Sequence, residues 1–304
     1  MQDILFHQYD SSPFSEKVRV CFGIKNLAWR AVSQPVIMPK PELVALTGGY
    51  RRTPVMQIGA DIYCDSQLIV RELERRYPSP TLFPAGDRGL AAALALWTDR
   101  SFFQASVALI FGNLGDRVPE AFIKDREALR GQPFDTAAMR RAAPHASAQL
   151  RAQVALLADQ LSDGRSFLTG DAPGLADANG YYNLWFMRSA HPPAAQVFED
   201  NDIVRGWAER VQRIGHGIRS DASREEAIDI ARSAAPLPGG IDPTDELTEF
   251  KGRKINVAAD DYGRDVVCGT LVSCSPYHVA IQRNDARIGD VVVHFPRIGF
   301  TIGQ

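Results

Sequence analysis

The periodicity of the apolar residues changes twice along this chain of 304 residues, and the two changes limit the folds that it can adopt. Up to about residue 83, short runs with strand periodicity alternate with runs of helical periodicity. From about residue 88 the pattern is helical, and from about residue 247 it consists of short strands. Segments rich in proline and glycine, 81–89 and 236–243, separate these regions. The sequence therefore predicts an α/β unit over 1–83, an all-helical unit over 88–235 and a small all-β unit over 247–304.

The composition is that of an ordinary globular protein, with 45% hydrophobic and 23% charged residues and a net charge of -2. Such a balance gives no electrostatic reason for a nucleic-acid partner, and the longest apolar run, 90–97, is too short to span a bilayer. The start of the chain lacks the pattern of a signal peptide, and the four cysteines fit no zinc or CxxC spacing. We expect a cytoplasmic protein with free thiols, without a metal and without a nucleic-acid or membrane partner.

In the first unit the expected element order is βαβαββα. The strands are expected over 4–7, 29–32, 54–58 and 61–64, and the helices over 14–24, 42–46 and 66–77. Gly59-Ala60 is a hairpin signal between the last two strands, and Pro78 ends the last helix. This is the order of a thioredoxin-like domain.

The second and third units differ sharply in pattern. In the second, helices are expected over 90–111, 120–129, 135–161, 175–189, 202–214 and 224–234. Ser223 and Glu226 form a capping-box pattern before the last of them. In the third, strands are expected over 254–258, 266–273, 278–283, 290–295 and 299–302, which suggests a small barrel or curled sheet. Cys268 and Cys274 are an even number of residues apart, a spacing compatible with one sheet face.

Ser12 stands where chemistry can occur, between the first strand and the first helix. Pro13 suits the first helical position and Ser12 the N-cap, so the hydroxyl lies beside unsatisfied N–H groups and the positive end of the helix dipole. A free thiol has a pKa of about 8.5, and one hydrogen bond to a charged group contributes about 1.5–3 kcal/mol. The hydroxyl and the helix end are therefore sufficient to ionise a bound thiol near neutral pH. The alternative is that Ser12 only caps its helix.

Two further features lie in the same unit. Thr53 precedes Pro54 at the start of a strand, where a cis proline would turn the Thr53 backbone toward a peptide-like ligand. An ordinary edge-strand proline is the alternative. Asp65 and Ser66 lie where a strand leads into a helix N-terminus, which suits a carboxylate ligand, and Asp65 can accept from an ammonium group. The alternative is that one of them is only the N-cap.

Together these motifs resemble the glutathione S-transferase family. In that family a Ser-Pro-Phe or Cys-Pro-Phe turn is followed seven residues later by an arginine, and Ser12 and Arg19 keep that distance. The family also has an acidic-Ser pair eleven and twelve residues after its strand-leading proline, as Pro54, Asp65 and Ser66 do here. The resemblance extends over about residues 1–235. A departure is Gly174, which replaces the usual hydroxyl N-cap three positions before an aspartate and predicts a weaker helix start.

The resemblance implies a fold and a set of binding residues. The fold is a thioredoxin-like domain followed by the all-α C-terminal domain of a glutathione S-transferase, with the β unit as an extension. Ser12 would hydrogen-bond the glutathione thiolate, the Thr53 backbone before cis-Pro54 would pair with the cysteinyl unit, and Asp65 and Ser66 would hold the γ-glutamyl group. The remaining candidates are Arg52 near the glycyl carboxylate, Lys40 with a solvated surface lysine as its alternative, and Ser11 or Ser15 in place of Ser12.

The resemblance also implies an activity: a homodimeric transferase whose co-substrate, glutathione, attacks a hydrophobic electrophile. The electrophile site would lie between the first two units, with one or two side chains facing it from the set Trp97, Phe102, Phe103, Ser106 and Phe111. The main rival is a non-catalytic glutathione-binding or scaffold protein. A glutathione-dependent reductase is disfavoured because a serine cannot form a mixed disulfide. The β unit is left with three roles: to cover the active site, to extend a dimer interface or to bind a partner.

Overall fold

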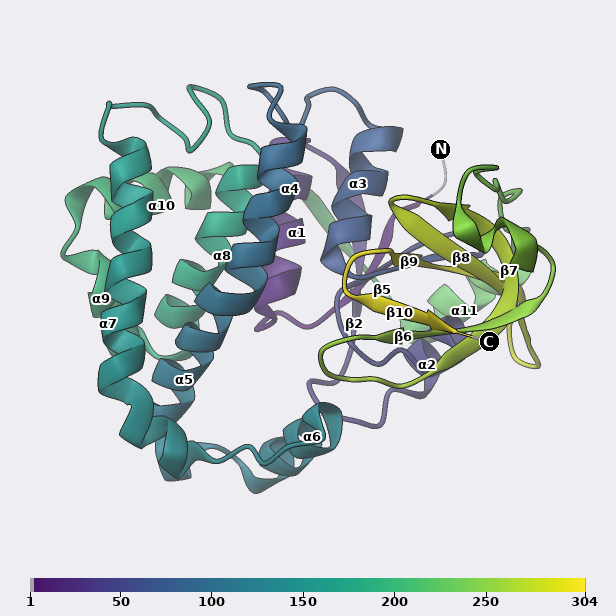
Figure 1. Cartoon of the computed structure of the whole chain (residues 1–304), viewed down its shortest axis with the longest axis horizontal. Helices are drawn as coiled ribbons and strands as arrows, with labels where there is room; N and C mark the ends of the chain where they lie inside the picture. The colour runs from purple at the N-terminus through teal and green to yellow at the C-terminus, as the bar shows by residue number, and fades with distance from the viewer. Residues whose placement is uncertain (1–2, 304) are drawn as a thin grey trace.

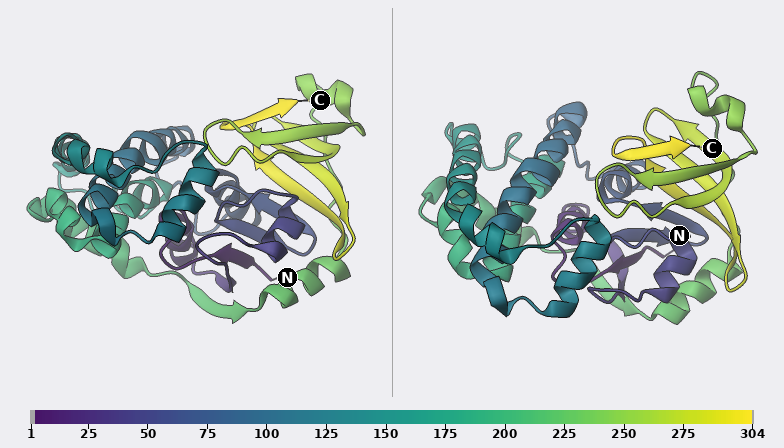
Figure 2. Two further views of the ribbon diagram at one scale, coloured as in Figure 1. Left: turned by 90° about the horizontal axis from the view of Figure 1, so that it is seen from below. Right: turned by 60° about the horizontal axis from the view of Figure 1, so that its bottom comes forward.

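The structure of the protein is a computed structural model that describes residues 3–303. Its centre is one open ten-stranded sheet with the strand order β10-β6-β7-β8-β9-β4-β3-β1-β2-β5. The helical domain lies at one end of the molecule and the C-terminal strands lie at the other, with the first unit between them (Figures 1 and 2).

The first unit has the predicted thioredoxin-like order. Its strands are β1 (Leu5–Gln8), β2 (Ala28–Ser33), β3 (Val55–Ile58) and β4 (Asp61–Cys64), and its helices are α1 (Pro13–Ile24), α2 (Pro41–Thr47) and α3 (Ser66–Arg76). β1 runs parallel to β2 and antiparallel to β3, and β3 and β4 form the predicted hairpin. β1 and β4 run in the same direction, because each is antiparallel to β3. The helices that follow them, α1 and α3, therefore begin at the same edge of the sheet.

The helical domain consists of α4 (Arg88–Trp97), a π-helical turn (Thr98–Phe102), α5 (Phe103–Leu114), α6 (Glu120–Arg130), α7 (Thr136–Leu161), α8 (Leu175–Ala190), α9 (Gln196–Glu199) and α10 (Asp202–Ile214). The helix expected over 90–111 is therefore interrupted by a wider turn. π-helical turns inside α-helices occur frequently at functional sites. Helix α8 is almost entirely buried and forms the centre of the domain.

The start of α8 explains the departure at Gly174. Asp177 accepts hydrogen bonds from the Gly174 and Leu168 N–H groups at 2.9 and 2.8 Å and from the Trp207 indole at 2.8 Å. A side chain on Gly174 would place its Cβ 2.9 Å from the Leu82 carbonyl oxygen, which itself accepts from Leu175 N–H. Glycine is therefore required by the close approach of the interdomain linker, and the buried Asp177 secures the helix start without a hydroxyl N-cap.

The prediction of an all-helical segment up to residue 235 is wrong at its end. Strand β5 (Ile218–Ala222) pairs in parallel with β2 and extends the sheet of the first unit, and α11 (Arg224–Ser233) packs against α2 and β2. The predicted cap before α11 is present, since Ser223 accepts from Glu226 N–H at 3.0 Å. β5 gives no strand signal because four of its five residues are exposed and it is held by backbone pairing at the sheet edge.

All five predicted C-terminal strands are present: β6 (Lys254–Ala259), β7 (Val267–Ser275), β8 (His278–Asp285), β9 (Gly289–Pro296) and β10 (Phe300–Gly303). Of the two expected forms, a small barrel or a curled sheet, the barrel is not found: β9 pairs in parallel with β4 and joins the strands to the sheet of the first unit. The two parts also share one apolar core, in which Leu43 and Ile62 of the first unit pack with Val257 and Val293. The β unit is thus an extension of the thioredoxin-like sheet.

The two cysteines of β7 do not share a face. A register shift between Leu271 and Ser273 inserts one residue into the strand, so the alternation of faces changes between Cys268 and Cys274. As a result Cys268 is exposed and Cys274 is buried, and all four cysteines of the chain are free. Within residues 3–303 no helix has the length and apolar character needed to cross a membrane.

We predict that Asp177→Ala lowers the free energy of unfolding by about 3 kcal/mol, because three buried donors lose a charged acceptor. Urea unfolding followed by tryptophan fluorescence measures this loss. Asp171→Ala, in the exposed loop before the same helix, is the matched control and should change the midpoint little. Equal midpoints for the two variants would contradict the role of Asp177.

Candidate functional site

Two adjoining cavities lie in the cleft between the first unit and the helical domain. The larger has a volume of about 980 Å³ and the smaller a volume of about 80 Å³. Both are lined by Phe14, Arg52, Thr53, Asp99, Arg100, Asp261 and Tyr262. These shared residues form a waist between the cavities, and two of them belong to the C-terminal β unit.

Ser12 lines the larger cavity at the N-terminus of α1. Its Oγ accepts a hydrogen bond from Ser15 N–H at 3.2 Å, so it caps the helix and keeps its own hydroxyl proton for a partner. Arg19 donates to the Asp10 carbonyl at 2.9 Å and so braces the loop that presents Ser12. Of the two alternatives, Ser11 is exposed on the same cavity, whereas Ser15 is fully buried and does not line it.

Thr53 lies at the waist, directly before Pro54. The peptide bond between them is cis, the isomer that the sequence analysis considered for this position. Among residues 3–303, no backbone hydrogen bond is found for the Thr53 N–H or C=O. An unpaired donor and acceptor beside a cavity can pair with the backbone of a peptide-like ligand.

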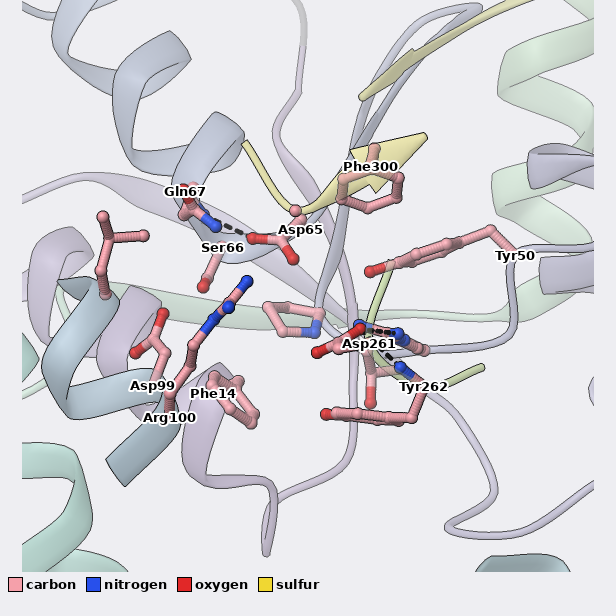
Figure 3. Close-up of a pocket in the computed structure, with 15 residues that line it drawn as sticks. Phe14, Tyr50, Asp65, Ser66, Gln67, Asp99, Arg100, Asp261, Tyr262 and Phe300 are labelled. Atoms are coloured by element: carbon pink, nitrogen blue, oxygen red, sulfur yellow. Dashed lines mark hydrogen bonds and ion pairs between the residues drawn. The ribbon is translucent and has the colours of Figure 1, made fainter. Parts of the chain in front are cut away.

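Asp65 and Ser66 line the smaller cavity at the N-terminus of α3, together with Gln67 (Figure 3). Asp65 has a φ of +73°, a conformation that is costly for a residue with a side chain and is found preferentially at binding sites. Its carboxylate accepts from Gln67 N–H at 2.9 Å. Burial raises the pKa of Asp65, although the Gln67 N–H and the charge of Lys17 oppose this. An ammonium group in the smaller cavity would supply the missing counter-charge to this carboxylate, and the helix end suits a carboxylate group.

Arg52 is brought to the waist, but the C-terminal β unit already contacts it. Its Nη2 lies 2.5 Å from the Asp261 carboxylate, and the guanidinium carbon lies 3.9 Å from the centre of the Tyr262 ring. The Nε atom is buried without a hydrogen-bond partner in the described part of the chain. Arg52 is therefore largely occupied by the β unit, and a ligand carboxylate would meet Asp261 at its guanidinium.

Lys40 is not the solvated surface lysine that was its alternative. Its side chain lines the larger cavity, is buried, and donates to the Arg51 carbonyl at 3.3 Å. Burial, helped by the charge of Arg126, lowers the pKa of Lys40 to about 8. The lysine thus carries a poorly compensated charge toward the cavity.

The larger cavity combines a basic rim with an aromatic wall. Seven basic and four acidic side chains line it, a net formal charge of +3 that favours an anionic ligand. The aromatic wall consists of Phe14 of α1, Phe103 and Phe111 of α5, Phe122 of α6, and Trp185 and Phe186 of α8. Of the five side chains considered for the electrophile site, Phe103 and Phe111 line the larger cavity, whereas Trp97, Phe102 and Ser106 line neither cavity.

Four charged or polar residues of the waist were not identified from the sequence: Asp99 and Arg100 of the π-helical turn, and Asp261 and Tyr262 of the β unit. Asp99 accepts from the buried Lys17 at 2.7 Å and from the Tyr182 hydroxyl at 3.0 Å, which joins α1, α8 and the turn beneath the cavities. Asp261 and Tyr262 lie between two predicted strands, 254–258 and 266–273, where no site was expected. No local pattern connects either pair to a site formed by residues of the first unit.

Comparisons with known proteins agree with this geometry. Residues 6–81 match the family described as glutathione S-transferase, N-terminal domain, and residues 107–216 match a domain of unknown function, DUF7962. No curated protein gives a significant match. A crystal structure of a GST-like protein from Pseudomonas syringae is 38% identical, covers 99% of this chain and 100% of its own, and has a TM-score of 0.79. That coverage includes the C-terminal β unit.

Two less similar structures share the fold. A glutathione S-transferase from Rhodospirillum rubrum F11 is 24% identical over 69% of this chain and 87% of its own, with a TM-score of 0.55. A glutathione S-transferase of Ceriporiopsis subvermispora, in complex with glutathione, is 18% identical over 70% of this chain and 96% of its own, with a TM-score of 0.54.

We predict that Lys40 makes stability depend on pH between about 8 and 10.5, its folded and its ordinary pKa. In this window the unfolded chain holds a proton that the folded chain has lost, so the stability of the native protein rises with pH. Relative to Lys40→Met, the native protein should gain about 3 kcal/mol between pH 7 and pH 10.5. Thermal or urea unfolding at both pH values measures the difference, and the exposed Lys251→Met is the control. A difference that does not change with pH would contradict the assignment.

Proposed function

The chain belongs to the family of glutathione S-transferase-like proteins, and from this membership we propose that it binds glutathione and transfers it to a hydrophobic electrophile. The observation that carries the proposal is the alignment along one cleft of three sets of polar groups that can each form further hydrogen bonds. These are the Ser12 hydroxyl, the unpaired backbone of Thr53, and Asp65 with Ser66 at the start of α3.

In the proposed complex the γ-glutamyl end lies in the smaller cavity. Its ammonium group pairs with Asp65, and its carboxylate accepts from Ser66 and the N–H groups at the start of α3. The cysteinyl unit crosses the waist and pairs with the Thr53 backbone. The glycyl carboxylate then points toward the basic side of the larger cavity, where Arg52 and Lys40 lie. Each polar end of the tripeptide thus meets a group of complementary charge.

Ser12 activates the thiol in this arrangement. Its oxygen already accepts from Ser15 N–H, so its proton is directed to the sulfur, and the hydrogen bond is worth more to the thiolate than to the thiol. A contribution of about 1.5–3 kcal/mol corresponds to a depression of the thiol pKa by about one to two units. The proton released by the thiol passes to solvent through the larger cavity.

The electrophile occupies the aromatic wall beside the sulfur. In a substitution the sulfur–carbon bond forms as the bond to the leaving group breaks, and the leaving group departs with the bonding electron pair. In an addition the electron pair moves onto the acceptor, which then takes a proton from solvent. The apolar surroundings raise the effective concentration of a hydrophobic partner next to the thiolate.

The proposal further includes a homodimer, as the family resemblance implies, and a reducing cytoplasm, which suits four free cysteines and a thiol co-substrate. The rival function is glutathione binding without turnover. The crowding of the waist by the C-terminal β unit favours this rival, since the γ-glutamyl cavity has a volume of only about 80 Å³.

We predict that glutathione bound to the native protein ionises at least one pH unit below its value in solution and that Ser12→Ala removes most of this shift. The ultraviolet absorbance of the bound thiolate, titrated against pH, measures both values. Ser12→Thr, which keeps a hydroxyl and a cap, should retain the shift, and Ser11→Ala is the control on the same cavity.

The possible outcomes separate the two functions. An ionised thiol that depends on Ser12 supports the transferase. Binding without a change in the thiol pKa supports a non-catalytic glutathione-binding protein, and a shift that survives Ser12→Ala moves the activating role to another donor of the cavity. No binding would refute both functions.

A further inference from the structure

A loop of the C-terminal β unit lies across the cleft. Residues 260–264, which we call the cleft loop, connect β6 to β7 and extend from the β unit to α6 (Figure 2). Asp261 and Tyr262 line both cavities and face Asp65 and Ser66 across the smaller one (Figure 3). The C-terminal unit therefore supplies one wall of the site.

The cleft loop contacts three separate elements. Asp261 pairs with Arg52 of the first unit, and Asp260 lies 3.6 Å from Arg100 of the π-helical turn. Gly263 N–H donates to the Leu129 carbonyl of α6 at 2.7 Å. Its φ of +59° and the closeness of Arg52, whose Nε would lie 2.9 Å from an added Cβ, make glycine the residue that fits here.

The two ion pairs of the cleft loop are partly exposed, which makes them reversible. The side chains of Asp260 and Asp261 are each 42% exposed. An ion pair with a partner of such exposure contributes little to stability, so displacing Asp261 from Arg52 costs little. The Gly263 hydrogen bond to Leu129 and the stacked Tyr262 ring add to the cost of moving the whole loop. The strands on either side stay in the sheet through their own core.

The contact between Asp261 and Arg52 occupies donors that a ligand carboxylate could use. Asp261 places a carboxylate on the guanidinium that would otherwise receive a carboxylate of the ligand. An internal and an external carboxylate then compete for the same donors, and in the closed arrangement the stacked Tyr262 ring holds the guanidinium beside Asp261.

We propose that Asp261 is an internal competitor of the glutathione site: it holds Arg52 in the free protein and is displaced by the glycyl carboxylate, so the cleft loop closes the empty site and opens as the ligand binds. This inference rests on the proposed function for the identity of the ligand. It assigns the C-terminal β unit the first of its three roles, covering the site. The cover opens when the glycyl carboxylate replaces Asp261 at Arg52.

The test compares two ligands and two acidic residues. The dissociation constants of glutathione and of its glycyl monoethyl ester are measured by titration calorimetry on the native protein and on Asp261→Asn. The asparagine keeps the shape of the side chain but not its charge. We expect glutathione to bind about two- to five-fold more tightly to Asp261→Asn, the size of an exposed ion pair, and the ester to bind both proteins equally.

Two controls isolate the contact. Asp265→Asn removes the same charge from an exposed residue farther along the connection between β6 and β7, and should leave both dissociation constants unchanged. In an Arg52→Gln background, Asp261→Asn should no longer tighten glutathione binding. Thermal unfolding of each variant establishes that it is folded.

Each other result overturns the inference in a recognisable way. Equal glutathione affinity of the native protein and Asp261→Asn, or weaker binding by the variant, would show that Asp261 does not compete with the ligand. An equal gain for the ester, or the same gain in Asp265→Asn, would show that the effect does not involve the glycyl carboxylate or Arg52. Binding of neither ligand by either protein would refute the proposed function itself.

Discussion

The parallel pairing of β4 with β9 is the contact on which the arrangement of this molecule depends. Without it β4 would be an exposed sheet edge, and the five C-terminal strands would have no fixed position relative to the first unit. The pairing is reinforced by the Val292 N–H, which donates to the Ala60 carbonyl at 3.0 Å, and by His294, whose Nε2 lies 2.9 Å from the Asp61 carboxylate. Because it continues the sheet directly, the β unit shares the core of the thioredoxin-like unit and holds the cleft loop at the site.

The charged groups that face the cleft differ in how fully each is paired with an opposite charge. The N-termini of α1 and α3 both meet it, and basic side chains exceed acidic ones around the larger cavity. Three of the acids that face the cleft differ in their partners: Asp99 has Lys17, Asp261 has Arg52, and Asp65 has the Gln67 N–H. Asp65 has the weakest compensation of the three, because its partner is a neutral N–H group. This difference in pairing, more than the shape of the cleft, indicates where an ammonium group would be bound.

The features that could be predicted from the sequence are those encoded locally. Ser12, Thr53 and Asp65 each lie at the start of a helix or strand, where capping and turn rules apply within a few residues. The C-terminal strands also have clear alternation, so their positions were predicted to within one or two residues. The partner of a strand could not be predicted. The side chains of β5 do not indicate that its backbone pairs with β2. Nothing in the sequence of β9 indicates that β4 is its neighbour, so the open extension of the sheet was not predicted. The pairing of Arg52 with Asp261 joins residues 209 positions apart, and a local pattern cannot contain it.

The cleft loop can act on the site without disturbing the fold, because different kinds of contact hold the strands and the loop. The strands that carry the cleft loop are fixed by apolar burial, since Ile255 and Val257 of β6 and Val267 and Leu271 of β7 are all buried. The loop between them is attached to the cleft by ion pairs, one stacked ring and one backbone hydrogen bond. Apolar burial does not respond to a carboxylate, whereas an exposed ion pair does, because a second carboxylate replaces the first at little cost. A ligand with a carboxylate at this point can therefore release the loop while every strand of the sheet remains paired.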